Sequence, residues 1–572
     1  MNVLPVTGAQ NTSVAALPIP GFASVREASN NRTMASEFPW WRHAVVYQVY
    51  LRSFADGNND GTGDIAGLRD RLPYIRSLGV DAIWVNPWYE SPLADGGYDV
   101  ANYRRIDERF GTIEDARALI EEAKQLGLRL LVDLVPNHTS SEHRWFKEAI
   151  TSPPGSPARD RYHILPGKGP DGAVPPTDWR SVFGGSAWTR LPDGEWYLHL
   201  FDASQPDLNW ANEEVQDEFK SIMRFWLDLG ASGFRVDVAH ALVKEQGYPD
   251  TGVDQDQVLE SLTAHDSPVW DRNELHDIVR GWRKVLDEYP DTMMIAEAWV
   301  PSWDRLSRYL RPGEYHQAFD FHFLMSPWDP VEMKSRIDVA ITSAAKVGAV
   351  PTWVLSNHDV VRHATRYGLP NEVESRSWLL DGDRSLLDPD MGLRRSRAAA
   401  LLMLALPGSV YLYQGEELGL PEVHDLPAEV LQDPVWERSG NRAKGRDGCR
   451  VPIPWTEGDP AFGFCGVEPW LPQPEWWGEY SVEAQDGRPG STLELYRSAL
   501  ELRDRWLRSD EDIEWLDFGQ DVVAFRRGSG LTCVVNFGDP IHIPDGDLLA
   551  VSEPLDDDSI PTDAAVWLAS GD

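Results

Sequence analysis

The sequence predicts a (β/α)8 TIM barrel with an inserted domain after its third strand and an antiparallel β domain at its C-terminal end. Apolar strand patterns alternate with amphipathic helical patterns eight times between about residues 43 and 506, and eight such units favour a closed parallel barrel. A stretch rich in Pro, Gly, Asp and Trp interrupts the alternation after the third strand, and it is too long for an ordinary loop. Beyond residue 507, only short strand patterns remain.

The first half of the predicted barrel contains three strands. They are expected at residues 44–50, 81–86 and 128–135, which are short segments rich in Val, Ile and Leu. An apolar face at helical spacing precedes the second strand, in a helix that we expect to be distorted at Pro73. A similar face over residues 116–123 precedes the third strand.

The second half adds five strands. Helical periodicity resumes over residues 215–229 and leads into a buried strand within Gly233–His240. The later strands are expected at residues 293–296, 318–323, 352–355 and 409–413, and the last helix at residues 493–506.

These patterns predict four parts of the chain. They are an N-terminal extension (1–39), a barrel (40–138 and 213–506), an inserted domain (139–212) and a β-rich terminal domain (507–572).

The composition narrows the possible partners. A formal net charge of −38 disfavours nucleic acid and anionic membranes, because both are polyanions. No run of eighteen apolar residues is present, so no membrane span is expected. The first forty residues do not follow a signal-peptide pattern, and three cysteines are too few for a disulfide framework. We therefore expect a cytoplasmic enzyme, and its many tryptophans suit sugar rings as well as a core.

Polar side chains gather at the carboxyl ends of predicted strands three, four, five and seven. Barrel active sites are built at these ends. Arg235 and Asp237 alternate on one strand and so point to the same side, where the cation is expected to keep the carboxylate ionised. A purely structural ion pair is the alternative, but burying so many charges for stability alone is costly. The residues are Asn137, His138, Arg235, Asp237, Glu297, His358 and Asp359.

Four segments that contain these residues resemble, in order along the chain, the four signature regions of glycoside hydrolase family 13, the α-amylase family. They are Asp133–His138, Gly233–Asp237, Ile295–Trp299 and Ser356–Asp359. A fifth segment, Gln205–Asn209, resembles the form found in the α-glucosidase and oligo-1,6-glucosidase branch. The resemblance covers about residues 40 to 570. It implies a barrel with an inserted domain B and a terminal domain C, which agrees with the organisation above.

The resemblance also implies catalytic roles. Asp237 would be the nucleophile, Glu297 the general acid/base and Asp359 the stabiliser of the transition state. Retaining hydrolysis needs two carboxyl groups about 5–5.5 Å apart, which neighbouring strands can supply. The apolar neighbours of Glu297 are expected to keep it protonated. By the same analogy, His138, Arg235 and His358 would contact the sugar.

Two further segments concern substrate binding. Tyr98, in Gly96–Val100, would offer an aromatic platform to the first glucose. Asp99 resembles the carboxylate that grips the non-reducing end together with a guanidinium, for which Arg446 and Arg450 are both candidates and Arg450 is slightly favoured. A loop-stabilising salt bridge is the alternative. Phe183 would line the same pocket from domain B.

The loop from residue 56 to residue 64 has oxygen ligands at every second position. This pattern suits a hard cation, and similar loops in the α-glucosidase branch bind structural calcium or magnesium. An Asx-turn without metal is the alternative. The candidate ligands are Asp56, Asn58, Asp60, Thr62 through its carbonyl, and Asp64.

These features predict an exo-acting, retaining α-glucosidase that releases α-D-glucose from short α-glucosides and needs no organic cofactor. An oligo-1,6-glucosidase, or a transglucosylase or sucrose-acting enzyme of the same family, remains the alternative. Val238, next to the nucleophile, resembles the oligo-1,6-glucosidase pattern, whereas Ala239 and His240 depart from it. We therefore expect both linkages to be accepted, with maltose-type substrates preferred. The enzyme is expected to be a monomer or a homodimer.

Overall fold

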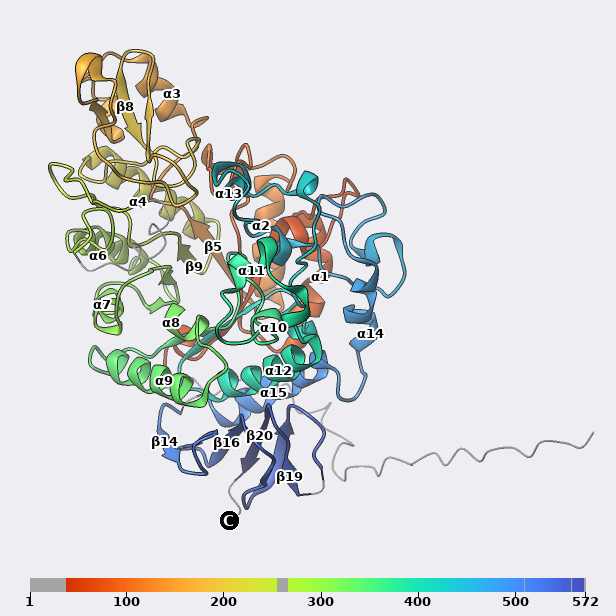
Figure 1. The fold of residues 1–572 in the computed structure, drawn as a ribbon. Helices are drawn as coiled ribbons and strands as arrows, with labels where there is room; N and C mark the ends of the chain where they lie inside the picture. The colour runs from red at the N-terminus through yellow and green to blue at the C-terminus, as the bar shows by residue number, and fades with distance from the viewer. Residues whose placement is uncertain (1–37, 255–265, 509, 557, 570–572) are drawn as a thin grey trace, which may run out of the picture. The chain divides into compact units, whose positions relative to one another are not determined.

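The computed structural model describes residues 38–254, 266–508, 510–556 and 558–569 (Figure 1). The predicted N-terminal extension therefore lies almost entirely outside the described residues. Eight parallel strands form the central sheet in the order β11-β10-β9-β5-β2-β1-β13-β12. An isolated parallel bridge between Phe319 and Thr352 joins the two ends, so the predicted barrel is confirmed. The strands are β1 (Val45–Val49), β2 (Ala82–Val85), β5 (Arg129–Leu134), β9 (Gly233–Val236), β10 (Met293–Ala296), β11 (Gln317–Ala318), β12 (Thr352–Val354) and β13 (Ser409–Tyr413).

The sixth strand is shorter than predicted. The sequence indicated a strand over residues 318–323, but β11 ends at Ala318 and helix α8 (Phe321–Leu324) follows. Asp320 starts this helix, because its side chain accepts a hydrogen bond from the backbone N–H of Phe323 at 2.8 Å. The predicted strand is wrong beyond Ala318 because Asp320 is a helix N-cap.

Amphipathic helices lie between the barrel strands. In α1 the apolar side chains at helical spacing are buried as predicted, but the helix continues through Pro73. The longer helices are α1 (Ile65–Leu78), α2 (Ile113–Gln125), α4 (Glu213–Asp228), α6 (Leu275–Leu286), α7 (Trp303–Tyr309), α9 (Pro330–Ala345), α12 (Pro389–Ala405) and α15 (Thr492–Trp506). Shorter elements are β3 (Tyr89–Glu90), β4 (Asn102–Ile106), α10 (His363–Arg366), α11 (Ser375–Asp381), α13 (Pro434–Arg438) and α14 (Val482–Gln485).

The insertion between β5 and α4 contains helix α3 (Arg144–Thr151) and a small antiparallel sheet. The sheet has the order β6-β8-β7, with β6 (Ile164–Pro166), β7 (Trp188–Arg190) and β8 (Glu195–Leu198). Trp179 and Trp188 of the insertion pack in one apolar cluster with Val238 and Trp270, which follow β9. This contact fixes the insertion to the end of the barrel at which β5 and β9 finish (Figure 1).

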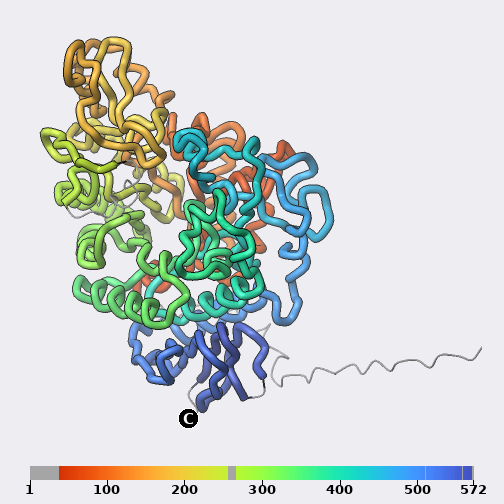
Figure 2. Tube along the Cα trace, viewed as in Figure 1, coloured from red at the N-terminus to blue at the C-terminus, as the bar shows by residue number. Residues whose placement is uncertain are grey.

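The C-terminal segment forms an antiparallel sheet beside α12 and α15 (Figure 2). Trp567 is fully buried there, and its indole N–H donates to the carbonyl of Leu401 in α12 at 3.1 Å. The sheet order is β14-β15-β16-β20-β18, and β17 pairs with β19. The strands are β14 (Ile513–Leu516), β15 (Val522–Arg527), β16 (Leu531–Asn536), β17 (Ile541–His542), β18 (Asp547–Val551), β19 (Ser559–Ile560) and β20 (Ala564–Ala569).

Residues Pro39–Asp572 form one compact unit. The numbered boundaries between barrel, insertion and terminal domain therefore stay predictions. Within the described ranges we find no helix with the length and hydropathy of a membrane span.

Candidate active site

A single guanidinium joins three carboxylates at the ends of β5, β9 and β10. Arg235 donates through Nη1 to Asp237 at 2.6 Å and to Asp133 at 3.0 Å. Its Nη2 lies 2.8 Å from Oε2 of Glu297. The close approach of β9 to β10 depends on Gly233 (φ +142°), where a Cβ would lie 1.8 Å from the carbonyl oxygen of Met293. The two carboxylates predicted to do chemistry thus share one cation.

The charge balance of this group is uneven, because three buried carboxylates face one guanidinium. Burial raises the pKa of Asp237 well above its usual range; Arg235 opposes the rise, and Glu297 and Asp133 add to it. Burial also raises the pKa of Asp133 to about 6. Burial therefore outweighs the guanidinium in setting the pKa of Asp237, contrary to the prediction that the cation keeps this carboxylate ionised.

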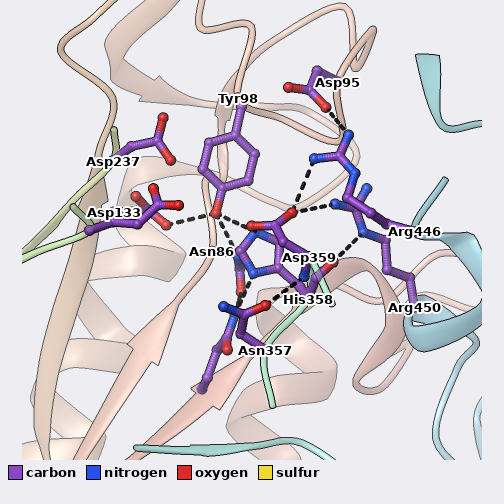
Figure 3. A network of polar contacts seen from close by, with 12 residues as sticks. Asn86, Asp95, Tyr98, Asp133, Asp237, Asn357, His358, Asp359, Arg446 and Arg450 are labelled. Carbon is purple, nitrogen blue, oxygen red and sulfur yellow. Dashed lines mark hydrogen bonds and ion pairs between the residues drawn. The ribbon is translucent and has the colours of Figure 1, made fainter. Parts of the chain in front are cut away.

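Asp359 lies on the opposite side of the site and is held by two arginines. Its Oδ1 accepts from Nη1 of Arg446 and Nη2 of Arg450, each at 3.0 Å, and His358 lies 3.2 Å from Oδ2 (Figure 3). Although burial acts in the opposite direction, His358 and the two arginines lower the pKa of Asp359. This carboxylate is therefore ionised.

Tyr98 and His358 are stacked at the base of the site. Their rings are 5.3 Å apart with an interplanar angle of 11°. Gln48 donates through Nε2 to Nδ1 of His358 at 2.8 Å, so the proton of the neutral imidazole is on Nε2, 2.7 Å from the Tyr98 hydroxyl. The hydroxyl also accepts from Asn86 at 2.8 Å and donates to Asp133 at 3.0 Å. Tyr98 therefore cannot rotate freely, and a sugar would meet a fixed ring.

The carboxylate that contacts a guanidinium in the loop of residues 95–99 is Asp95 and not the predicted Asp99. Nη2 of Arg446 contacts Oδ1 of Asp95 at 2.6 Å, while Arg450 contacts Asp359 (Figure 3). Arg446 is also held by Asp433, through Nε at 2.5 Å. Arg446 therefore links Asp95 to Asp359, and we call these three side chains the wall. Arg450 contacts Asp359, and its predicted role in substrate binding stays a prediction.

Asp99 does not take part in that wall. It is fully buried and accepts hydrogen bonds from the backbone N–H groups of Ala94 and Asp95, each at 3.0 Å. Burial raises the pKa of Asp99 to about 6. Its side chain closes its own loop, because Gly96 and Gly97 both have positive φ and turn the chain back. Asp95 thereby faces Arg446 while Asp99 points inward.

The other predicted contacts border the same space. His138 lies 3.1 Å from Gln205, which donates to Asp95 at 3.0 Å. Burial lowers the pKa of His138 to about 4, so its imidazole is neutral. The Phe183 ring lies 5.2 Å from the Arg446 guanidinium. Gln205 and Phe183, both from the insertion, thus contact Asp95 and Arg446.

Val238 follows Asp237 in the chain and contacts Glu297. Its φ of +42° is unusual for a β-branched residue, and its N–H donates to Oε2 of Glu297 at 2.9 Å. Its side chain is only 8% exposed within the apolar cluster shared with domain B. The strained backbone orients a donor toward Glu297.

The candidate metal loop is closed by backbone hydrogen bonds. Asp56 accepts from the N–H groups of Asn59 and Gly61, at 2.6 and 2.7 Å. Asp64 caps α1 by accepting from Gly67 at 2.7 Å, and Asp60 accepts from Thr62 at 2.9 Å. Within the described ranges, no set of three carboxylate, imidazole or thiol side chains converges as a metal cluster. The carboxylates therefore make the contacts of Asx-turns here.

Three residues near the reacting groups were not assigned from the sequence. Asp133 lies within a signature segment, Asp95 precedes the Gly-Gly pair, and Trp299 donates from Nε1 to Oε1 of Glu297 at 3.3 Å. The Gly-Gly turn was a usable signal for Asp95. No sequence pattern indicated which of the two aspartates, Asp95 or Asp99, contacts the arginine and which is buried in the loop.

A family model described as "Alpha amylase, catalytic domain" matches residues 48–510. The chain belongs to the α-amylase family, glycoside hydrolase family 13. It is 37% identical to a probable alpha-glucosidase of Rhizobium meliloti, over 87% of this chain and 90% of that protein. It is 34% identical to an oligo-1,6-glucosidase of Heyndrickxia coagulans, over 81% and 85% of the two chains. The solved structure of an alpha-glucosyl transfer enzyme, XgtA, superposes with a TM-score of 0.81 at 33% identity and covers 94% of this chain and 100% of that one.

Membership of the α-amylase family confirms the resemblance drawn from the signature segments. It also makes the chain a glycoside hydrolase with a barrel and a C-terminal antiparallel domain. The catalytic and binding roles of individual residues stay predictions; the structure gives the contacts that each of these residues makes.

Proposed function

We propose that the protein is an exo-acting, retaining α-glucosidase that releases α-D-glucose from the non-reducing end of short α-glucosides. One observation carries this proposal: Arg235 bridges Asp237 and Glu297, opposite the ionised Asp359. A nucleophile and an acid on neighbouring strands that share one cation are near enough for the short carboxyl separation of a retaining mechanism. The alpha-glucosidase and oligo-1,6-glucosidase relatives support the same substrate class.

In the proposed reaction Asp237 attacks the anomeric carbon while the bond to the leaving oxygen breaks. Glu297 gives its proton to that oxygen, and Arg235 stabilises the carboxylate that forms. Water then attacks the glucosyl-enzyme and gives a proton to Glu297, which frees Asp237. The ionised Asp359 would accept hydrogen bonds from sugar hydroxyls, and Tyr98 would support the ring face.

The proposal of exo action rests on the wall formed by Asp95, Arg446 and Asp359. These charged side chains are linked to one another at 2.6 and 3.0 Å. A linked row of charges at one end of a cleft excludes a longer chain and offers several hydrogen bonds to a terminal glucose. Phe183 supports the wall from domain B.

The proposal also covers which glycosidic linkages are cleaved and whether water or a sugar accepts the glucosyl group. We propose that both maltose-type and α-1,6-linked glucosides are accepted, with the former preferred. Transfer to a sugar in place of water is the second candidate, and the structural similarity to an alpha-glucosyl transfer enzyme favours testing it. Both routes pass through the same covalent intermediate, so they differ only in which acceptor reaches the site.

Assays with maltose, isomaltose, sucrose and p-nitrophenyl α-glucoside test this proposal. We expect hydrolysis with α-glucose as the first anomer detected by NMR, and fastest turnover of maltose or the aryl glucoside. Asp237→Asn should lower kcat by about a thousandfold or more, because it keeps the volume and removes the nucleophile. β-Glucose as the first product, or substantial activity in Asp237→Asn with an unchanged fold, would contradict the proposed mechanism.

We also propose that the Asp56–Asp64 loop holds a structural divalent cation. Its donors are oxygens, which calcium and magnesium prefer. Burial raises the pKa of Asp64, and among the described residues no cationic side chain forms a salt bridge with Asp56, Asp60 or Asp64. A bound cation would supply the missing positive charge and tie this loop to the start of α1.

Chelation tests the cation proposal. Treatment with EDTA should lower the Tm, and added calcium or magnesium should restore it, because a ligand that binds only the folded state stabilises that state. The variant Asp60→Asn, which removes an exposed candidate ligand, should respond less. An unchanged melting curve, together with no metal found by elemental analysis, would leave the loop as a set of Asx-turns.

Finally, we propose a cytoplasmic enzyme that acts on small sugars as a monomer or homodimer and binds neither nucleic acid nor membranes. The strong negative charge supports the last part. Sedimentation and cell fractionation would test these statements.

A further inference from the structure

Three donors hold the carboxyl group of Glu297. Nη2 of Arg235 and the backbone N–H of Val238 contact Oε2, at 2.8 and 2.9 Å. The indole Nε1 of Trp299 contacts Oε1 at 3.3 Å. The two oxygens of this group therefore have different surroundings: Oε2 receives two short contacts, whereas Oε1 receives one long contact from Trp299.

The indole of Trp299 is itself held in place. It stacks on Phe321 with ring centroids 4.1 Å apart and an interplanar angle of 11°. Phe321 is buried and lies 5.7 Å from Phe319, which packs against Tyr411 at 4.8 Å. This row of rings leads from Glu297 into the barrel core. Trp299 therefore has a defined orientation, although it is only half-buried.

We infer that Trp299 is a positioning residue that sets the direction of the proton on Glu297. The inference rests on the proposed function. Oε2 has no room for a proton between its two donors, so an acidic proton belongs on Oε1. An indole N–H is a donor without an acceptor, so it cannot take this proton away. It limits rotation of the carboxyl group and directs the free side of Oε1 toward the leaving oxygen.

The same contact acts in both half-reactions. In the first, the proton moves from Oε1 to the leaving oxygen as the glycosidic bond breaks, and the indole N–H then donates to the carboxylate oxygen that remains. In the second, Oε1 takes a proton from the attacking water. A donor to Oε1 is thus useful only where proton transfer matters, so its removal should affect substrates with poor leaving groups most.

The variant Trp299→Phe tests the inference because it keeps a ring on Phe321 and removes the N–H. Trp303→Phe is the matched control, since Trp303 is another half-buried tryptophan, which packs against His322 at 5.0 Å. For both variants and the wild type, kcat/KM would be measured on aryl α-glucosides with a range of leaving-group pKa values and on maltose. Melting curves and circular dichroism would report folding.

We expect Trp299→Phe to lose about tenfold in kcat/KM on maltose and on the poorest aryl leaving groups, mainly in kcat. The loss should shrink to about twofold on dinitrophenyl glucoside, whose departure needs little protonation. In Trp303→Phe, the change in kcat/KM should not depend on the pKa of the leaving group, so the plot of this change against leaving-group pKa should have no slope. If Trp299→Phe does not fold, Phe321→Leu should show the same slope more weakly, because it keeps the N–H but loosens the indole.

The inference would be overturned if Trp299→Phe lost kcat/KM equally on all leaving groups or not at all, or if Trp303→Phe showed the same dependence on the leaving group. These outcomes would leave the proposed function intact. A wild-type enzyme inactive on every α-glucoside would overturn the proposed function and this inference with it.

Discussion

Asp95 and Asp99 are four residues apart in one loop, yet their carboxylates have different partners. Asp95 contacts the Arg446 guanidinium at 2.6 Å, whereas Asp99 accepts two backbone N–H groups and is fully buried. The Asp95 carboxylate, which contacts a guanidinium beside the catalytic group, can take part in substrate binding. The Asp99 carboxylate, which accepts backbone hydrogen bonds within its own turn, stabilises the loop. The two residues therefore provide a matched test of the wall.

We expect Asp95→Asn to raise KM for maltose by about tenfold or more, because a charge-assisted contact of the wall is lost. Asp99→Asn should keep kcat/KM within about threefold of wild type. It should instead lower the free energy of unfolding by about 1–3 kcal/mol, since one buried backbone donor loses its acceptor. Steady-state kinetics and urea unfolding measure both effects. Similar KM values for the two variants would contradict the assignment of the wall to Asp95.

The short helix that follows β13 buries two adjacent glutamates. Glu417 accepts hydrogen bonds from the hydroxyls of Tyr47 and Tyr74, each at 2.7 Å. Glu416 accepts from the backbone N–H of Tyr413 at 3.2 Å and from the hydroxyl of Tyr496 at 3.3 Å. Burial raises the pKa of Glu416 to about 8. This short helix therefore places a buried carboxyl group that titrates near neutral pH in the protein interior.

The sign of the resulting pH dependence follows from the two states. In the unfolded chain Glu416 loses its proton near pH 4.3, whereas in the folded chain it keeps the proton until about pH 8. Between these values the folded state binds more protons, so its stability falls as pH rises. The full contribution is present below about pH 4 and is lost as pH rises through about 8.

We expect Glu416→Gln to flatten the dependence of unfolding free energy on pH between about 5 and 8. Each unit of difference in pKa corresponds to about 1.4 kcal/mol, so the variant should gain up to a few kcal/mol relative to wild type as pH rises across this window. Urea unfolding at several pH values measures the effect. Glu429→Gln, at an exposed glutamate, makes the same charge change and should leave the slope unchanged. An equal effect in both variants would contradict a role for burial.

At the scale of the whole molecule, charge is out of balance. The chain has 91 acidic residues and 53 Lys and Arg residues. Many arginines are already bound to carboxylates, as in the contact of Arg104 with Glu218 at 2.6 Å. The excess acidic groups therefore repel one another across a folded surface, and this repulsion is weaker in the expanded unfolded chain.

Salt should consequently stabilise the protein. Raising sodium chloride from about 10 mM to about 0.5 M shortens the screening length from roughly 30 Å to roughly 4 Å, and we expect the Tm to rise. Sodium sulfate at equal ionic strength separates screening from the additional effect of an excluded anion. A Tm that falls steadily with sodium chloride would show that attractive ion pairs outweigh the repulsion.

The sequence by itself determined the barrel, the place of the insertion and the group of polar residues that meets at one end of the barrel. Strand and helix periods are local properties, and the residues that follow β5, β9, β10 and β12 must meet at one end because the strands are parallel. Asp237, Glu297 and Asp359 could therefore be placed at this end before any side chain was positioned, and their predicted catalytic roles came from the resemblance to the α-amylase family.

Only the tertiary structure decided which charged groups pair. Asp95 and Arg446 are 351 residues apart in the chain, and no periodic pattern distinguishes them from Asp99 and Arg450. The end of β11, which depends on the hydrogen bond at the Asp320 cap, and the indole of Trp299 against Glu297 were decided in the same way. The directions of Asp95 and Trp299 are set by contacts from distant segments and leave no trace in local sequence, whereas the Asp320 cap is a local hydrogen bond that an apolar strand pattern concealed.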